Sequence, residues 1–539
     1  MNMNYSRLIF RFFFAILTMC SYPAFAQTAR PVKEDTTQKI QILNYTKRLT
    51  FQTIDDTTKL TIIVGDVALR QGKTLFYADS CVINNNTNVF EAWGRQVHIN
   101  DSDTANIYSN HLRYLTKRKL AYLDGNVKLT DGKGTLTTPD LEYDMETNIG
   151  IYKNGGRVVN DKTVLTSREG WYYADLKDIY FKKDVVLKDP AYNIVTDSLL
   201  YNTLTKTTRF ISQTVITDSS GRRIVTKEGN YNQQTGIAEF GQRPTIYDHG
   251  TKITANTIYQ NDSIYRADGN AVIIDSVQGT TLIGGTIFQD KKTEAILATR
   301  KPLMIIKQDN DSIYVTADTL FSAKLSDKFG MDSVIVDTIK GTKRAMFGAK
   351  DSSNRYFEAY RNVRIFNDSL QAVCDSMFYS FKDSVFRLYD DPVVWAQQNQ
   401  VTGDTILLFT KNKKADRVEA YENGFMVNKL DTDVYNQIKS TRIDGWFIDG
   451  NIDSVRAKGF AECIYYIQDE DSAYTGINQS QSDLIDIYFD NKELERVVFR
   501  SAVTGTLWPI RQKSPKDMLL TNFRWLENRR PKTKFEMFE

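Results

Sequence analysis

The stretch Gly125-Asn126-Val127-Lys128-Leu129 decides the fold class of this chain. Val127 and Leu129 are apolar and stand two residues apart with a lysine between them. That is the period of a β-strand with one buried face, whereas an amphipathic helix would need spacings of three and four. The preceding Gly125-Asn126 pair is typical of a turn. The stretch therefore predicts a short strand that follows a turn.

The same element recurs along most of the chain. Where consecutive copies are clear, their valines are separated by 29 to 31 residues, as between Val67, Val97 and Val127. The copies begin at Gly65, Arg95, Gly125, Gly156, Lys183, Gln213, Gly269, Arg361 and Asp391. A fixed period of this size is typical of a repeat architecture in which each unit packs only on its neighbours.

A second element follows each first one: an Asp, Asn or Gly, then an aromatic or aliphatic residue three or four positions later. Examples are Asp140 with Tyr143 and Asp197 with Tyr201. Two elements per period predict two β-segments per rung. We expect an all-β, elongated stack of antiparallel strands, with about thirteen rungs and little helix. The pattern degenerates near residues 330–350 and 430–455, where loops or irregular rungs are expected.

The N-terminus predicts export. Arg7 and Arg11 give a basic n-region, the stretch Leu8–Met19 is strongly apolar but short, and Ala24-Phe25-Ala26 fits a signal-peptidase site; an uncleaved anchor is the alternative. The expected organisation is a signal peptide at 1–26, an N-terminal lead-in at 27–50, a β-repeat array at 51–510, as one array or two sub-arrays, and a basic C-terminal tail at 511–539. The expected location is the periplasm, alone or in association with the outer membrane.

Composition argues against several classes of function. The 69 Lys and Arg nearly balance the 66 Asp and Glu, so no nucleic-acid partner is expected. The recurring aspartates predict a shared turn or backbone cap and not acid–base catalysis; they are Asp79, Asp140, Asp175, Asp197, Asp318, Asp375 and Asp404. His98, His111 and His249 lack zinc-ligand spacing. We therefore expect no enzyme activity, metal or cofactor.

Three further features have ordinary interpretations. Cys81, Cys374 and Cys463 are far apart in sequence and odd in number, which favours small buried residues over a disulfide framework. The acidic run Asp469-Glu470-Asp471 is expected to be a solvated loop, with calcium binding as the alternative. The basic run Lys117-Arg118-Lys119 predicts a solvated turn, or a contact for anionic headgroups.

The repeated pattern is clearest at Gly65-Asp66-Val67 with Ala78-Asp79, and at Gly125-Asn126-Val127 with Asp140 and Tyr143. It resembles the OstA/LptA family of lipopolysaccharide-transport proteins, and most closely the long OstA-like proteins of Bacteroidota, whose ends resemble Phe523-Arg524-Trp525 and Arg530-Pro531 here. The resemblance implies an open, twisted, V-shaped β-jellyroll with acyl chains between its layers. It also implies edge-to-edge pairing with other Lpt-type jellyroll proteins and with the outer-membrane translocon.

The function expected from this resemblance is shielding of the acyl chains of lipopolysaccharide, or a related lipid, on the way to the outer membrane. The candidate lining residues are Val67, Leu69, Val97, Ile99, Val127, Leu129, Leu141, Tyr143, Val186, Tyr201, Val215, Tyr259, Phe288, Phe321, Val363, Ile365, Phe378 and Val393. The alternative is that these residues fill a closed core. The chain would then be a structural or protein-binding β-solenoid without lipid cargo.

Overall fold

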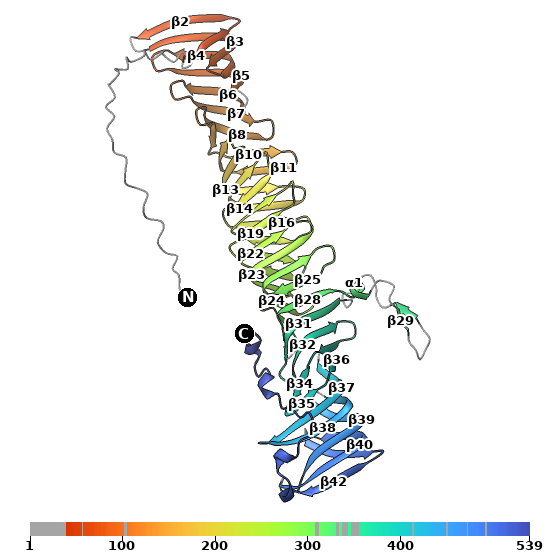
Figure 1. The fold of residues 1–539 in the computed structure, drawn as a ribbon. Coiled ribbons are helices and arrows are strands. Elements are labelled where there is room, and N and C mark those ends of the chain that lie inside the picture. Colours follow the sequence, from red (N-terminus) through yellow and green to blue (C-terminus); the bar gives the residue numbers. More distant parts are fainter. Residues whose placement is uncertain are drawn as a thin grey trace, which may run out of the picture.

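The computed structural model describes residues 39–538 except 56–57, 102–104, 308–311, 330–333, 337–342, 346–354, 412–413, 449–450, 470, 472 and 491–492. The expected signal segment therefore lies outside the described residues. The described part is a long stack of antiparallel strands, with β2 near one end and β42 at the other (Figure 1). The expected all-β stack is confirmed, and the first strand, β1 (Gln41–Asn44), begins within the lead-in.

The first part of the stack is formed by β2 (Arg48–Asp55), β3 (Thr58–Gln71), β4 (Thr74–Asn84), β5 (Val89–Asp101), β6 (Ala105–Leu115), β7 (Leu120–Thr130), β8 (Thr135–Asp144), β9 (Ile149–Tyr152), β10 (Gly156–Asn160), β11 (Thr163–Ser167), β12 (Glu169–Tyr173), β13 (Asp178–Lys188), β14 (Tyr192–Asn202), β15 (Thr207–Phe210), β16 (Thr214–Asp218), β17 (Arg223–Thr226), β18 (Glu228–Asn232), β19 (Ala238–Gly241), β20 (Thr245–Asp248), β21 (Thr251–Thr254), β22 (Thr257–Gln260), β23 (Ile264–Asp275) and β24 (Thr280–Asp290).

It continues with β25 (Ile296–Thr299), β26 (Leu303–Lys307), β27 (Ser312–Thr316), β28 (Thr319–Lys324), β31 (Arg355–Phe366), β32 (Gln371–Ser380), β33 (Val385–Tyr389), β34 (Val393–Ala396), β35 (Asn399–Thr402), β36 (Thr405–Lys411), β37 (Lys414–Asp431), β38 (Val434–Ile448), β39 (Asn451–Gln468), β40 (Tyr474–Asp490), β41 (Glu493–Arg500) and β42 (Thr504–Pro509). A short helix, α1 (Leu325–Phe329), and a separate hairpin of β29 (Val334–Val336) and β30 (Lys343–Ala345) interrupt it.

Where two long strands pair, a bulge in one of them interrupts the register and creates two layers. In β7 the register against β8 is interrupted between Asp124 and Val127. The bulge divides β7 into residues 120–124 and residues 127–130. We call the sheet formed by 120–124 and the strand segments stacked on it the first layer, and the sheet formed by 127–130 and the segments stacked on it the second layer. Gly125 and Asn126 have φ values of 76° and 54°, in the left-handed region that favours glycine and asparagine. The repeated Gly-Asn-Val motif is therefore the bulge that bends a strand from one layer into the other.

Side chains at this corner link neighbouring tiers. Asp79 accepts the backbone N–H of Arg95 at 2.9 Å. Asn154 Nδ2 donates to Asp140 at 2.6 Å, and Asn423 Nδ2 donates to Asp404 at 3.1 Å. The backbone cap expected for the recurring aspartates is present at Asp79, whereas Asp140 and Asp404 accept hydrogen bonds from asparagine side chains.

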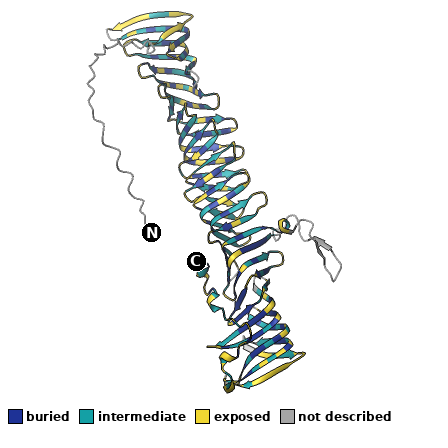
Figure 2. Ribbon diagram, in the orientation of Figure 1, coloured by how far each residue is buried: buried dark blue, intermediate teal, exposed yellow. Residues whose placement is uncertain are grey.

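One apolar cluster fills the space between the layers and runs from Ile63 to Ile485 (Figure 2). Alternate residues of each strand supply it, as period-two alternation requires. Cys81, Cys374 and Cys463 are buried and free, as expected, and burial raises the pKa of each thiol to about 12. The stack thus has a single continuous interior.

Two features of the C-terminal half differ from the sequence expectations or extend them. The prediction of irregular structure at 430–455 is wrong, because β38 and its neighbours are long and regular there. The second feature is the C-terminal segment 513–538, which we call the strap and which covers the outward face of the second layer in this region. Both faces of β38 are therefore partly covered, and its polar and apolar residues no longer alternate. This loss of alternation explains why the sequence pattern there looked irregular.

The strap runs back along the array, so the C-terminus lies beside its middle (Figure 1). Its regular segments, with the turn before it, are η2 (Ile510–Gln512), η3 (Pro515–Asp517), η4 (Glu527–Arg529) and η5 (Lys534–Phe538). Met518 and Leu520 pack against Phe425 and Val427, and Met537 packs against Leu303. Gln437 bonds the strap backbone on both sides of Leu519, donating to the Met518 oxygen and accepting from the Leu520 N–H.

Candidate functional site

The space between the two layers is the main candidate site, and most predicted lining residues lie in it. Those that belong to its buried cluster, each no more than 2% exposed, are Val67, Leu69, Val97, Ile99, Val127, Leu129, Leu141, Tyr143, Tyr201, Val363 and Ile365. They come from tiers between the N-terminal end of the array and its middle. The structure therefore brings residues separated by up to 298 positions (Val67 to Ile365) into one apolar interior.

The remaining candidates lie elsewhere. Val186, Val215, Tyr259, Phe288, Phe321 and Phe378 are half-buried. At all six the buried interior residues are immediate neighbours: Val185 and Leu187, Ile216, Ile258, Ile287, Leu320 and Met377. A shift of one residue moves a side chain to the other face of a strand, so at these positions a neighbour of the predicted residue faces the interior. Val393 is fully buried but packs near Leu526 of the strap.

The interior is densely filled in the N-terminal tiers. The rings of Phe76, Phe90 and Tyr114 lie with centroids 4.9–5.1 Å apart. In the C-terminal tiers a cavity of about 50 Å³ lies between the strands and is lined chiefly by apolar side chains. Its lining includes Met426, Ile438, Cys463, Ile485 and Val497.

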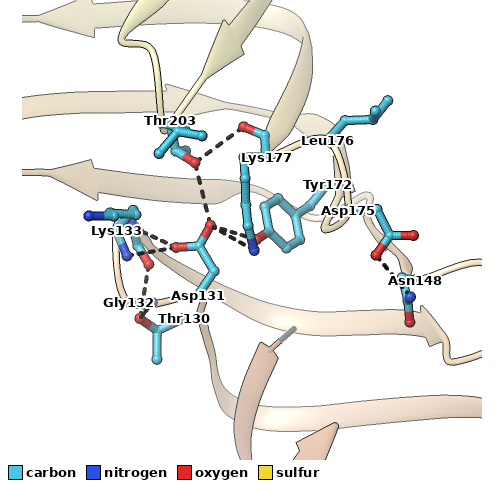
Figure 3. A network of polar contacts seen from close by, with 12 residues as sticks. Thr130, Asp131, Gly132, Lys133, Asn148, Tyr172, Asp175, Leu176, Lys177 and Thr203 are labelled. Atoms are coloured by element: carbon cyan, nitrogen blue, oxygen red, sulfur yellow. Dashed lines mark hydrogen bonds and ion pairs between the residues drawn. The ribbon is translucent and has the colours of Figure 1, made fainter. Parts of the chain in front are cut away.

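The layers are joined by the bulges at one side, and at the opposite side their hairpin turns face each other. Asp131 lies in the turn between β7 and β8, in the second layer, and reaches the first layer (Figure 3). Tyr172 donates its hydroxyl to Asp131 Oδ2 at 2.7 Å, and Thr203 donates to the same atom at 3.4 Å. The Asp131 side chain is only 2% exposed, with Lys177 Nζ at 3.9 Å.

The environment of Asp131 favours its ionised form. Burial by itself would raise the pKa of this carboxyl. The N–H groups of Gly134 and Lys133 and the Tyr172 hydroxyl all donate to it, and their combined effect lowers its pKa below the ordinary value. A hydrogen bond to an ionised carboxylate is stronger than one between neutral groups. Asp131 is therefore a charged link that closes the open side of the fold.

Similar polar links recur along this side, and we call them the clasps. Gln71 Nε2 donates to the Thr116 oxygen, and Tyr114 donates to Gln71 Oε1 at 2.5 Å. The other clasps join Asn160 to Tyr201 and Thr203, and Gln233 to Thr163, Asp189 and Tyr192. Sequence reasoning missed them. A signal for them was present in the sequence. Gln71 and Asn160 are polar residues beside a turn, at positions where the alternation of the strand places the side chain on the buried face.

Chemistry of other kinds has little support in the described ranges. No group of three or more His, Cys, Asp and Glu there could hold a metal ion. His98 stacks on Tyr108, and His111 contacts Asp124. Lys117 and Arg118 are exposed in a turn. The acidic run at 469–471 lies partly outside the described residues, and Asp469 accepts the N–H groups of Asp471 and Ala473 in a turn.

The fold and its interior define a class: a two-layered β-jellyroll that encloses an apolar space. Residues 37–197 match the family model described as OstA-like protein. A solved structure, LptH from Pseudomonas aeruginosa, the LptA homologous periplasmic component of the lipopolysaccharide transport device, is similar at 18% identity. The likeness covers 22% of this chain and 82% of that one, with a TM-score of 0.19. No curated protein matches the sequence.

No helix in the described ranges has the length and apolarity needed to cross a membrane.

Proposed function

We propose that this chain binds the acyl chains of lipopolysaccharide, or of a related lipid, between its two layers and helps to carry that lipid through the periplasm. The observation that carries the proposal is the unbroken apolar cluster from Ile63 to Ile485. The match of residues 37–197 to the OstA-like family model supports it. The role is that of a carrier, with binding and release in place of covalent chemistry.

Once the two layers separate, the free energy of burying acyl chains favours lipid binding over closure of the clasps. Each methylene removed from water contributes about 0.8 kcal/mol. Each hydrogen bond of a clasp contributes on the order of 1 kcal/mol net, because its groups can bond water instead. A few buried methylenes therefore offset the opening of one clasp. The bulges act as hinges, and acyl chains replace contacts between side chains such as Leu129 and Leu141.

A uniform lining suits a carrier. The interior repeats the same aliphatic and aromatic residues from tier to tier, so no single position holds the lipid much more tightly than the next. The cavity around Ile438 and Ile485 leaves space beside the interior side chains. We place the first acyl-chain contacts there.

The end of the stack supplies the partner site in this proposal. β1 and β2 each pair with β3, and Phe51 and Ile54 of β2 are largely exposed. An edge strand with exposed apolar residues favours pairing with another chain. We propose that a jellyroll protein of the same transport type, or the outer-membrane translocon, pairs at this edge.

A second candidate function is a structural or protein-binding β-solenoid without lipid. The observation that favours it is the density of the N-terminal interior, where residues such as Phe90 and Ile107 are fully buried. In that case the clasps would stay closed and the interior would serve only stability.

Photocrosslinking in cells distinguishes the two functions. A photoreactive amino acid at Val127 faces the interior, and one at the adjacent Lys128 faces solvent and is the matched control. The carrier function predicts lipopolysaccharide adducts at Val127 and at Ile485, and few at Lys128. Adducts only at Lys128, or none at any position in a folded chain, would overturn the carrier proposal and favour the solenoid.

A further inference from the structure

A band of charged residues crosses the outward face of the first layer in the C-terminal tiers, on β37 to β41. Val418, Ile443 and Val455 of these strands point into the apolar interior. The alternate residues therefore face outward. In the central row Glu419 lies opposite Asp444, Asp444 opposite Arg456, and Arg456 opposite Asp486.

The carboxylates of this band lie close to the sheet and are shielded from solvent, and the cations lie over them on the solvent side. Arg417 Nε contacts Glu419 at 3.0 Å, and Arg442 contacts both Glu419 and Asp444, at 3.3 and 2.6 Å. The three acidic side chains are 3–7% exposed, whereas the basic side chains paired with them are 35–55% exposed. The surface presented to solvent is therefore cationic.

The lower part of the band repeats this arrangement. Asp486 is held between Arg456 Nε at 2.6 Å and Arg500 Nε at 3.0 Å, while Lys458 Nζ is 3.2 Å from Asp444. Burial by itself would raise the pKa of Asp486, and the two guanidinium groups lower it below its ordinary value. The acid stays charged and fixes the two arginines in place.

The charges of the band do not cancel. Its outward rows contain six cations, Arg417, Arg442, Arg456, Lys458, Arg496 and Arg500, against three carboxylates, Glu419, Asp444 and Asp486. The guanidinium of Arg442 lies 4.7 Å from the Tyr421 ring centre and that of Arg496 lies 4.6 Å from the Tyr488 ring centre. Aromatic support of this kind orients a cation without neutralising it.

We propose that this cationic band docks the protein on the phosphate groups of anionic lipid headgroups at a membrane surface. Adjacent strands are about 4.8 Å apart, so the band is a broad array of fixed cations on one face of the sheet. Guanidinium groups match phosphate oxygens in pairs. An array of this kind is complementary in charge to a layer of phosphates. The proposal concerns the outside of the fold and does not depend on a lipid cargo inside it.

The test is sedimentation of the full chain with vesicles. One set of vesicles contains phosphatidylcholine alone and the other contains phosphatidylcholine with phosphatidylglycerol. The variant K458Q/R496Q/R500Q removes three cations, yet Asp444 keeps Arg442 and Asp486 keeps Arg456. The control variant K117Q/R118Q/K119Q removes three cations from an exposed turn far from the band.

We expect the wild-type chain to bind only the vesicles that contain phosphatidylglycerol, and less tightly as salt is added. The band variant should bind roughly a hundredfold more weakly, from about 1 kcal/mol per cation near an anionic surface. The turn variant should bind like wild type, and circular dichroism should show all three chains folded. Absence of binding by the wild-type chain, or an equal loss in both variants, would overturn the proposal.

Discussion

Gln400 on β35 makes two hydrogen bonds to the strap backbone on either side of Trp525. Its side-chain amide donates to the Arg524 carbonyl oxygen, and its side-chain oxygen accepts the N–H of Leu526, both at 2.7 Å. Gln437 makes the same pair of bonds to Met518 and Leu520. An extended segment that pairs with no strand is thus held by two buried glutamines. The strap is bound as a peptide would be, with Asp391 fixing its Arg524 and Arg529.

Replacing Gln400 by alanine should release the middle of the strap. The strap backbone would lose two hydrogen bonds and leave buried polar groups unpaired, a cost of about 1–3 kcal/mol. Limited trypsin digestion should then cut at Arg524 and Arg529 faster than in the wild-type chain. Gln398, two residues away and exposed, provides the control as Gln398→Ala. Equal digestion of the two variants would mean that the bonds of Gln400 do not hold the strap.

Asp131→Asn should weaken the open side of the fold in a pH-dependent manner. The folded-state pKa of Asp131 lies below its ordinary value, so its charge stabilises the fold above that value. The contribution is lost as the pH falls through the folded-state pKa. Urea unfolding should show a deficit of about 1–3 kcal/mol near neutral pH that disappears at acid pH. The exposed neighbour Asp175, replaced by asparagine, should show a much smaller deficit; a deficit that does not vary with pH would contradict the ionised clasp.

Asn126→Val should destabilise the corner. Asn126 has a φ of 54°, a conformation that strongly disfavours β-branched side chains, so the cost should be about 1–3 kcal/mol. Lys128→Val, on the exposed face of the same strand, is the matched control and should change stability little. Thermal unfolding of both variants measures the difference. Comparable stability of the two would show that the bulge tolerates any residue.

The three buried cysteines should not react in the native chain. Burial raises the pKa of Cys81, Cys374 and Cys463 to about 12, so the thiolate is scarce at neutral pH, and the thiols are shielded from reagents. Iodoacetamide labelling with peptide mass spectrometry should modify these positions only after unfolding in urea. Rapid labelling of one cysteine in the native chain would reveal local opening of its tier.

Much of the fold could be predicted because its rules act between adjacent residues. The alternation of Val127, Lys128 and Leu129 requires a strand with one buried face. The Gly125-Asn126 pair supplies the left-handed conformations that a bulge needs. A repeat period near thirty residues then predicts that the same two-segment β-rung is stacked many times. These local preferences hold in any surroundings, so the strands, the bulges between the layers and the shared interior could be predicted from the sequence.

The sequence by itself determined the strand period, the bulge and the stacking. Only the tertiary structure decided which tiers meet across the open side, as at Asp131 and Tyr172, and where the strap and the cationic band lie. These contacts join residues tens to more than a hundred positions apart, and they depend on the offset between stacked half-strands. A shift of one residue, as between Val185 and Val186, changes the face on which a side chain lies without changing any local preference. The repeat period therefore leaves such contacts undetermined.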